Sequence, residues 1–177
     1  MPPVVSFVGW HNSGKTTLTR QVVTHLKAMG YRVGVIKSTK ETGIKVDQPA
    51  TDTALYKATG ADAVALLAPD QLIIQRLPPQ LELIHLVPLI FADMDIVIAE
   101  GFKQATQVAK IEVRRDAEAP WIHQQVTGVI AVASDLPLDN TYALHCFGLQ
   151  QSQELADFIV RRFLAPPLGT SASPQES

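Results

Sequence analysis

The chain has 177 residues, 46% hydrophobic and 18% charged, and this size and composition fit one globular domain with a substantial hydrophobic core. Fifteen Lys and Arg residues against seventeen Asp and Glu residues give a formal net charge of −2, which argues against nucleic acid as the main ligand because such proteins need a basic surface. The single cysteine, Cys146, excludes an internal disulfide and a thiolate metal cluster, and the lack of a signal-peptide pattern or a membrane-spanning apolar run predicts a cytoplasmic protein.

The first predicted strand, Val4–Val8, leads into the sequence Gly-Trp-His-Asn-Ser-Gly-Lys-Thr at residues 9–16, and a helix is expected over residues 17–29. This is the phosphate-loop pattern G-x-x-x-x-G-K-[ST] between a strand and a helix, where glycines and the helix N-terminus bring backbone N–H groups to an anion. Lys15 is expected to neutralise the β- and γ-phosphates of a nucleotide, and the Thr16 hydroxyl to be one ligand of Mg²⁺. The residues expected to hold phosphates are Gly9, His11, Asn12, Ser13, Gly14, Lys15, Thr16 and Thr17.

A second strand is predicted over residues 32–36, buried on both faces like an inner strand of a parallel sheet, so that strand, helix and strand form a right-handed unit. The polar segment 37–53 is too long for a simple connection and is typical of a functional loop. Its carboxylates, Asp47 and Asp52, could each reach the Mg²⁺ directly or through water. The alternative is that both are solvated loop charges, with Asp52 capping the next helix, over residues 53–59.

A β-hairpin is predicted from two apolar runs, residues 63–68 and 72–77, joined by Pro69-Asp70-Gln71. It interrupts the alternation of strands and helices, and it either lies along the edge of the sheet or pairs with another chain. We favour pairing with a second copy, and therefore a homodimer. A covering helix follows over residues 81–91, with Pro88 expected to bend or divide it.

Residues 95–101 form an apolar strand with a carboxylate near each end. Glu100 stands at the C-terminal edge, where ligands of parallel sheets collect, so we predict that it reaches the Mg²⁺ or its waters; the alternative is a solvated strand-end charge. Asp95 is expected only to begin the strand. Glu100 and Lys15 are the predicted catalytic residues, and Lys103 follows within reach of the phosphates.

The rest of the chain completes a single predicted nucleotide-binding domain over residues 1–164, followed by a disordered tail over residues 165–177, which is rich in Pro, Ser, Gly and Thr. The remaining predicted elements are strands at residues 109–114, 126–133 and 142–147 and a closing helix at residues 152–164. Together the elements predict an α/β fold of the phosphate-loop NTPase type, with a mostly parallel sheet, helices on both faces and an inserted hairpin.

Asp135 directly follows the predicted strand 126–133 and its short extension. A carboxylate at this edge could accept hydrogen bonds from the N1–H and N2 amino groups of guanine, which would select GTP over ATP. The alternative is a turn-forming Asp before Pro137. The five histidines are scattered without metal-ligand spacing, and no metal is assigned to them.

Several stretches together resemble the molybdopterin-guanine dinucleotide biosynthesis adaptor family, MobB, from Val4 to about Leu164. The order and spacing of E-G-F-K and A-S-D make the match more specific than the phosphate loop alone. The matching stretches are residues 9–17, Val35-Ile36-Lys37, the Asp47-x-Pro49-x-x-Asp52 loop, Ile98-Ala99-Glu100-Gly101-Phe102-Lys103 and Ile130-Ala131-Val132-Ala133-Ser134-Asp135.

The resemblance implies a GTP- and Mg²⁺-binding protein, usually dimeric, that assists the guanylyltransferase joining GMP to molybdopterin, with molybdopterin itself a further candidate ligand. The chain departs from the family at Ser38-Thr39-Lys40, where relatives often carry histidines, and at Ala50, where a glycine is common. Both departures lie in the polar segment 37–53, so the role of this loop does not follow from the resemblance.

The leading interpretation is a GTP-binding adaptor with weak GTPase activity. A nucleotide or small-molecule kinase is the alternative, but neither arginine pair, Arg114-Arg115 or Arg161-Arg162, lies in an obvious lid. A metal-insertion GTPase would need clusters of His or Cys residues, and the sequence has no such cluster, so this class is disfavoured. The sequence offers no clear second cation at the phosphates, so we expect slow hydrolysis, with Lys103 the best internal candidate for that cation.

Overall fold

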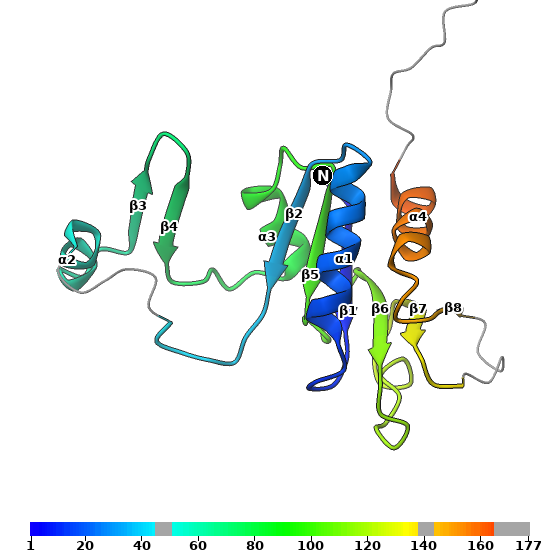
Figure 1. Ribbon diagram of the computed structural model, residues 1–177. Coiled ribbons are helices and arrows are strands. Elements are labelled where there is room, and N and C mark those ends of the chain that lie inside the picture. The colour runs from blue at the N-terminus through cyan, green and yellow to red at the C-terminus, as the bar shows by residue number, and fades with distance from the viewer. Residues whose placement is uncertain (45–50, 138–143, 165–177) are drawn as a thin grey trace, which may run out of the picture. The chain divides into compact units, whose positions relative to one another are not determined.

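The computed structural model describes residues 1–44, 51–137 and 144–164, and these fall into two compact units. The first contains residues 1–38 and the chain from residue 82 onward, and the second contains residues 39–81. Figure 1 shows the elements of both units. The predicted residues Asp47 and 165–177, and the beginning of the last predicted strand, lie outside the described residues.

The first unit is built on a six-stranded sheet in the order β2-β5-β1-β6-β7-β8. Every neighbouring pair of strands is parallel, so all C-terminal ends lie at one edge. The chain leaves β1 toward β2 and leaves β6 toward β7, which makes the crevice between the ends of β1 and β6 the topological switch point. The strands are β1 Val4–Val8, β2 Val33–Lys37, β5 Ile96–Glu100, β6 Ala109–Arg114, β7 Val129–Ser134 and β8 His145–Phe147.

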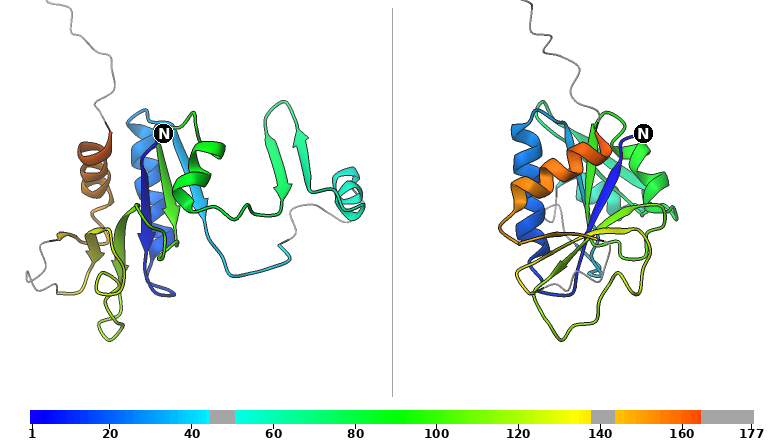
Figure 2. Two further views of the ribbon diagram at one scale, coloured as in Figure 1. Left: turned by 180° about the vertical axis from the view of Figure 1, so that it is seen from behind. Right: turned by 90° about the vertical axis from the view of Figure 1, so that its right-hand side faces the viewer.

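Helices cover both faces of this sheet, as the sequence predicts. On one face α1 (Lys15–Ala28) and α4 (Ser152–Phe163) pack together over inward-facing residues of the central strands, such as Phe7 and Ile98. On the other face α3 (Leu83–Ile90) packs over the alternate residues, such as Val97. The right-hand view of Figure 2 shows the sheet between these layers. Successive residues of each central strand point alternately into these two apolar layers. Both sets are buried, which explains why the central strands are apolar throughout.

The prediction that the second strand is an inner strand buried on both faces is wrong. Among the strands of the described residues, β2 lies at the edge of the sheet and pairs only with β5, and Val35 is 48% exposed. The strand is apolar for a different reason: α3 covers its other face, and a Cβ added at Gly34 would lie 2.6 Å from the Phe91 ring. Pro88 does not divide the predicted helix, because α3 is continuous through it.

The second unit contains α2 (Asp52–Ala58) and the predicted hairpin, formed by the antiparallel strands β3 (Ala63–Leu67) and β4 (Leu72–Arg76). Asp52 is not the cap of α2. Thr51 takes that position, with its Oγ1 accepting from Ala54 N at 3.4 Å, and Asp52 lies in the first turn.

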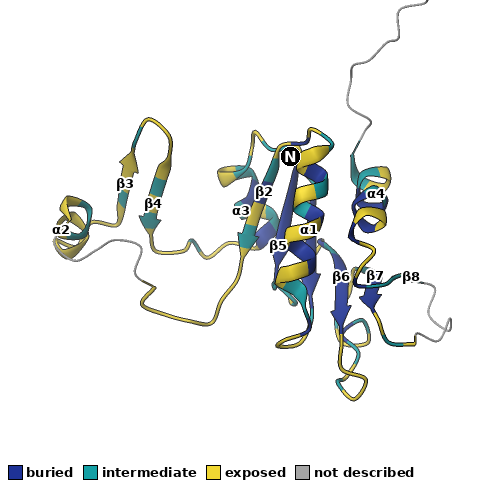
Figure 3. Ribbon diagram, viewed as in Figure 1, coloured by how far each residue is buried: buried dark blue, intermediate teal, exposed yellow. Residues whose placement is uncertain are grey.

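The hairpin forms a separate two-stranded sheet. Leu67, Leu72 and Ile74 share one of its faces and are 79%, 58% and 58% exposed, so the described residues of the second unit leave this face uncovered. Figure 3 shows the contrast between the exposed hairpin and the buried strands β1, β5 and β6. Among the described helices, none is long and apolar enough to cross a membrane.

Candidate functional site

The loop between β1 and α1 has a backbone that requires its two glycines. A Cβ at Gly9 would lie 2.4 Å from Ser13 Oγ and 2.5 Å from the carbonyl oxygen of Val113, so no side chain fits there. Gly14 adopts a left-handed φ of 89° at the N-cap of α1 and offers no side-chain cap to the helix. The first N–H groups of α1 therefore have no capping oxygen from this residue, and they lie at the positive end of the helix dipole. Such a helix start binds anions.

Lys15 reaches back across this loop. Its Nζ donates to the carbonyl oxygen of Trp10 at 2.6 Å and lies 3.4 Å from Ser13 Oγ. Partial burial lowers the pKa of Lys15; the Glu100 carboxylate opposes this shift, and the nearby cations Lys103 and Lys37 add to it. The side chain is thus a cation held among other cations over the loop.

Glu100 from β5 lies beside the first turn of α1. Thr16 Oγ1 donates to Glu100 Oε1 at 2.8 Å, and Lys37 Nζ lies 3.2 Å from the same oxygen. The contact is possible because β5 pairs directly with β1, with Phe7 opposite Glu100. The structure therefore brings together the predicted Thr16 hydroxyl and Glu100 carboxylate at the C-terminal edge of the sheet.

The turn after Glu100 is fixed by several backbone contacts. Gly101 has a φ of 97°, and a Cβ there would lie 2.4 Å from Ser38 Oγ. Ser6 Oγ donates to the carbonyl oxygen of Gly101 at 2.7 Å, and Gly101 N donates to the carbonyl oxygen of Phe7 at 3.0 Å. These bonds hold the end of β5 against β1, so the Glu100 carboxylate has a defined position.

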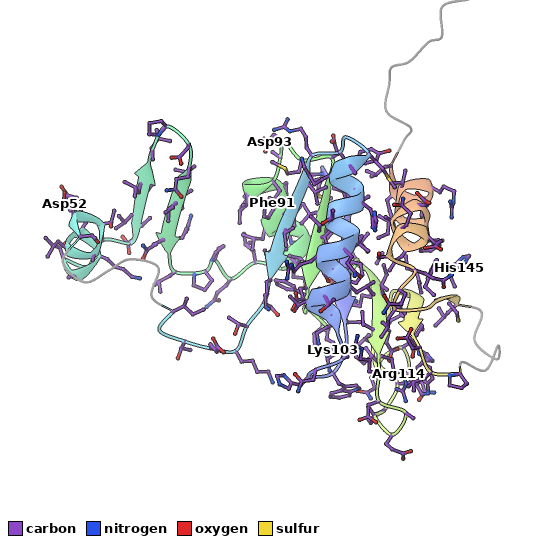
Figure 4. The ribbon with its side chains drawn as sticks, viewed as in Figure 1. Asp52, Phe91, Asp93, Lys103, Arg114 and His145 are labelled. Carbon is purple, nitrogen blue, oxygen red and sulfur yellow. The ribbon has the colours of Figure 1, made fainter. Side chains whose placement is uncertain are left out.

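Lys103 lies over the ring of Trp10, with its Nζ 3.6 Å from the ring centroid. Figure 4 labels Lys103 at the C-terminal edge of the sheet. Trp10 in turn donates from Nε1 to the carbonyl oxygen of Pro120 at 2.7 Å. Trp10 therefore positions the Lys103 ammonium beside the phosphate loop. Through its bond to Pro120 it also ties the loop to the segment after β6.

That segment, residues 115–128, is held by buried charged side chains of β6. The Glu112 carboxylate accepts from the N–H groups of Ile122 at 2.9 Å and His123 at 3.0 Å. Lys110, whose pKa is lowered by burial, donates to the carbonyl oxygens of Ala105 and Thr127 at 2.6 and 2.8 Å. These buried groups anchor both connections that flank β6.

Arg115, considered from the sequence only as part of an arginine pair outside any obvious lid, lies at this same edge of the sheet. A Cβ added at Gly14 would lie 3.1 Å from Cζ and Nε of Arg115, so the guanidinium covers the glycine that begins α1. Its position directly after a strand is visible in the sequence. What the sequence does not give is the strand order, which sets the end of β6 beside the end of β1.

The other predicted site residues are placed as follows. His11, Asn12 and Thr17 are exposed on the loop and the first turn of α1. Asp135 is exposed just after β7, two strands from β1, and its Oδ1 accepts from Leu149 N at 2.8 Å, so it shapes the turn as well as standing at the edge. Asp52 belongs to the other compact unit, where it lies in the first turn of α2.

A glycine loop between a strand and a helix, with a carboxylate from the adjacent parallel strand beside the loop threonine, defines a phosphate-loop NTPase-like α/β protein. The chain belongs to the MobB family: residues 4–135 match the family described as molybdopterin guanine dinucleotide synthesis protein B.

Similar proteins agree with this membership. The chain is 32% identical to the molybdopterin-guanine dinucleotide biosynthesis adapter protein of Escherichia coli, over 90% of this chain and 93% of that protein. The protein of the same description from Haemophilus influenzae is 31% identical, over 89% of this chain and 87% of its own length. Among solved structures, a MobB protein homolog from Bacillus stearothermophilus is 26% identical, with a TM-score of 0.68 over 89% of this chain and 95% of that one.

Proposed function

We propose that the protein is a GTP-binding adaptor with weak GTPase activity that assists the attachment of GMP to molybdopterin. The observation that carries the nucleotide part is the contact of Thr16 with Glu100 at the start of α1, directly after a loop in which Gly9 leaves no room for a side chain and Gly14 has a left-handed φ. The adaptor part is supported by family membership and by relatives described as molybdopterin-guanine dinucleotide biosynthesis adapter proteins. The expected partner is the guanylyltransferase of that pathway, with molybdopterin a further candidate ligand.

Phosphates would bind at the positive end of α1, where Lys15 and the loop N–H groups lie. A triphosphate offers Lys15 a charge-assisted contact in place of its bond to the Trp10 carbonyl oxygen. The cations Lys37 and Lys103 lie close enough to shift the pKa of Lys15, so the surroundings of the loop favour a polyanion. This charge pattern supports a nucleotide as the ligand.

Mg²⁺ fits the oxygen ligands at this position. Thr16 and Glu100 supply one hydroxyl and one carboxylate, hard oxygen ligands that Mg²⁺ uses together with phosphate oxygens and waters. When bound, the ion would neutralise charge on the phosphates. Among the described residues no group of three or more His, Cys, Asp or Glu side chains forms a metal site, which favours an ion shared with the substrate over one held by the protein alone.

Hydrolysis would be slow in the isolated protein. Within the described part of the chain, Glu100 is the carboxylate that contacts the first turn of α1, and it already contacts Thr16 and Lys37. In the nucleotide complex the same carboxylate would face Mg²⁺, and it would then be poorly placed to orient an attacking water as well. The activity we propose is therefore a weak GTPase, consistent with a protein whose main role is binding.

A homodimer is the oligomeric state we propose. The two edges of the β3–β4 hairpin and the apolar face of Leu67, Leu72 and Ile74 could be covered by a second copy of the chain. Exposed apolar strands of this kind are seldom left bare in soluble proteins.

The first prediction is that Lys15→Ala lowers GTP affinity by about 10- to 100-fold, because one charge-assisted phosphate contact is lost. Affinity is measured through Trp10 fluorescence, with Lys27→Ala, at the other end of α1, as the matched control. Wild-type protein should also co-elute with the guanylyltransferase in a GTP-dependent manner, and Lys15→Ala should not. Unchanged affinity in Lys15→Ala would mean that this loop is not the site.

The second prediction concerns the base. Asp135→Asn keeps an oxygen for Leu149 N but turns an amide toward guanine, so GTP affinity should fall about 10- to 100-fold while ATP affinity stays the same. Xanthosine triphosphate, which carries an oxygen in place of the guanine amino group, should bind the variant better than the wild type. Equal losses for GTP and ATP would leave Asp135 as a turn-forming residue.

The third prediction tests the hairpin. Leu67→Lys combined with Ile74→Lys places two like charges on the exposed apolar face and should convert the dimer into monomers, as measured by light scattering. Leu89→Lys, at a residue of α3 that is 71% exposed, is the control and should leave the dimer intact. A monomeric wild-type protein would contradict the proposal, as would a double variant that remains dimeric.

A further inference from the structure

We propose that Arg115 is a phosphate-binding residue of the nucleotide site, supplied by the segment after β6. The proposal rests on the proposed nucleotide function and deepens it by adding a cation to that site. Its basis is the closeness of the Arg115 guanidinium to Gly14, the N-cap residue of α1: a Cβ added at Gly14 would lie 3.1 Å from Cζ and Nε of Arg115. The ligand group it would bind is the phosphate chain, rather than the base.

The fold places Arg115 where ligands of open parallel sheets bind. β1 and β6 are neighbours whose chains leave in opposite directions, so their C-terminal ends flank the switch-point crevice. Val8, the last residue of β1, lies opposite Glu112, and β6 continues past it to Arg114. The phosphate loop therefore leaves one side of the crevice, and Arg115 enters from the other.

The local charges make this arrangement unfavourable without an anion. Arg115 lies against the positive end of a 14-residue helix, and among the described residues no carboxylate forms an ion pair with it. Lys15 is adjacent to Gly14 in the chain, and Glu100 pairs with Lys37. A phosphate chain would compensate this excess of positive charge, and the planar guanidinium can bind two of its oxygens at once.

The neighbouring residues hold the main chain of Arg115 in place. Arg114 is buried, donates to the carbonyl oxygen of Ala117 at 2.6 Å, and stacks on Trp121 with its Cζ 4.1 Å from the ring centroid. The Trp10 bond to Pro120 ties the same segment to the phosphate loop. The two adjacent arginines thus differ in role: Arg114 is structural, and Arg115 is exposed beside the loop.

The test compares Arg115→Ala and Arg115→Lys with the wild type, with Arg161→Ala on the exposed side of α4 as the matched control. Binding of GTP and of inorganic tripolyphosphate, which has no base, is measured by calorimetry in the presence of Mg²⁺. Thermal unfolding checks that each variant folds. We expect Arg115→Ala to weaken both ligands by about 10- to 100-fold, Arg115→Lys to recover part of the loss, and Arg161→Ala to match the wild type.

Three results would overturn the proposal while leaving the nucleotide site intact: affinities in Arg115→Ala equal to those in Arg161→Ala, a loss confined to GTP, or tighter binding in Arg115→Ala. The last would mean that Arg115 obstructs the loop. The Lys15→Ala variant is measured alongside. If the wild type binds neither ligand, or if Lys15→Ala binds both normally, the proposed function itself has failed.

Discussion

The contact between Thr16 Oγ1 and Glu100 Oε1 depends on one constraint, the direct pairing of β5 with β1. Because both strands are parallel and in register, the end of β5 lies beside the loop that follows β1. The Gly101 turn and the Ser6 bond to its carbonyl oxygen keep the carboxylate there. If β5 were one strand further away, the glycine loop would still bind an anion, but no carboxylate would stand beside its threonine.

The positive charge around the loop comes from residues that are distant in sequence. Lys15 is the first residue of α1, directly after the loop that follows β1. Lys37 lies at the end of β2, Lys103 after β5 and Arg115 after β6, with the Glu100 carboxylate beside Lys37. Each cation stands at or after the C-terminal end of a parallel strand, so the direction of the strands gathers them at one edge. This focused charge is a local feature, since the net charge of the whole chain is −2.

Much of this could be predicted from the sequence, because local patterns specify local structure. The phosphate loop, the strand ending at Glu100, the hairpin and the closing helix all appear close to their predicted positions. Strand order could not be predicted from such patterns, and the errors follow from it. An apolar run such as residues 32–36 looks the same whether it is an inner strand or, like β2, an edge strand covered by a helix on one face. For the same reason neither the position of Arg115 beside the loop nor the bond of Asp135 to Leu149 was predicted.

The central claim is that this edge of the sheet is a nucleotide site centred on Lys15, Thr16 and Glu100. The most direct test is a crystal structure with Mg²⁺ and a non-hydrolysable GTP analogue. The account predicts the triphosphate in the loop of residues 9–16, with Lys15 bonded to phosphate in place of the Trp10 carbonyl oxygen, and with Thr16 and Glu100 facing the ion. It would be contradicted by an analogue bound elsewhere, with Lys15 still bonded to Trp10 and Thr16 still bonded to Glu100.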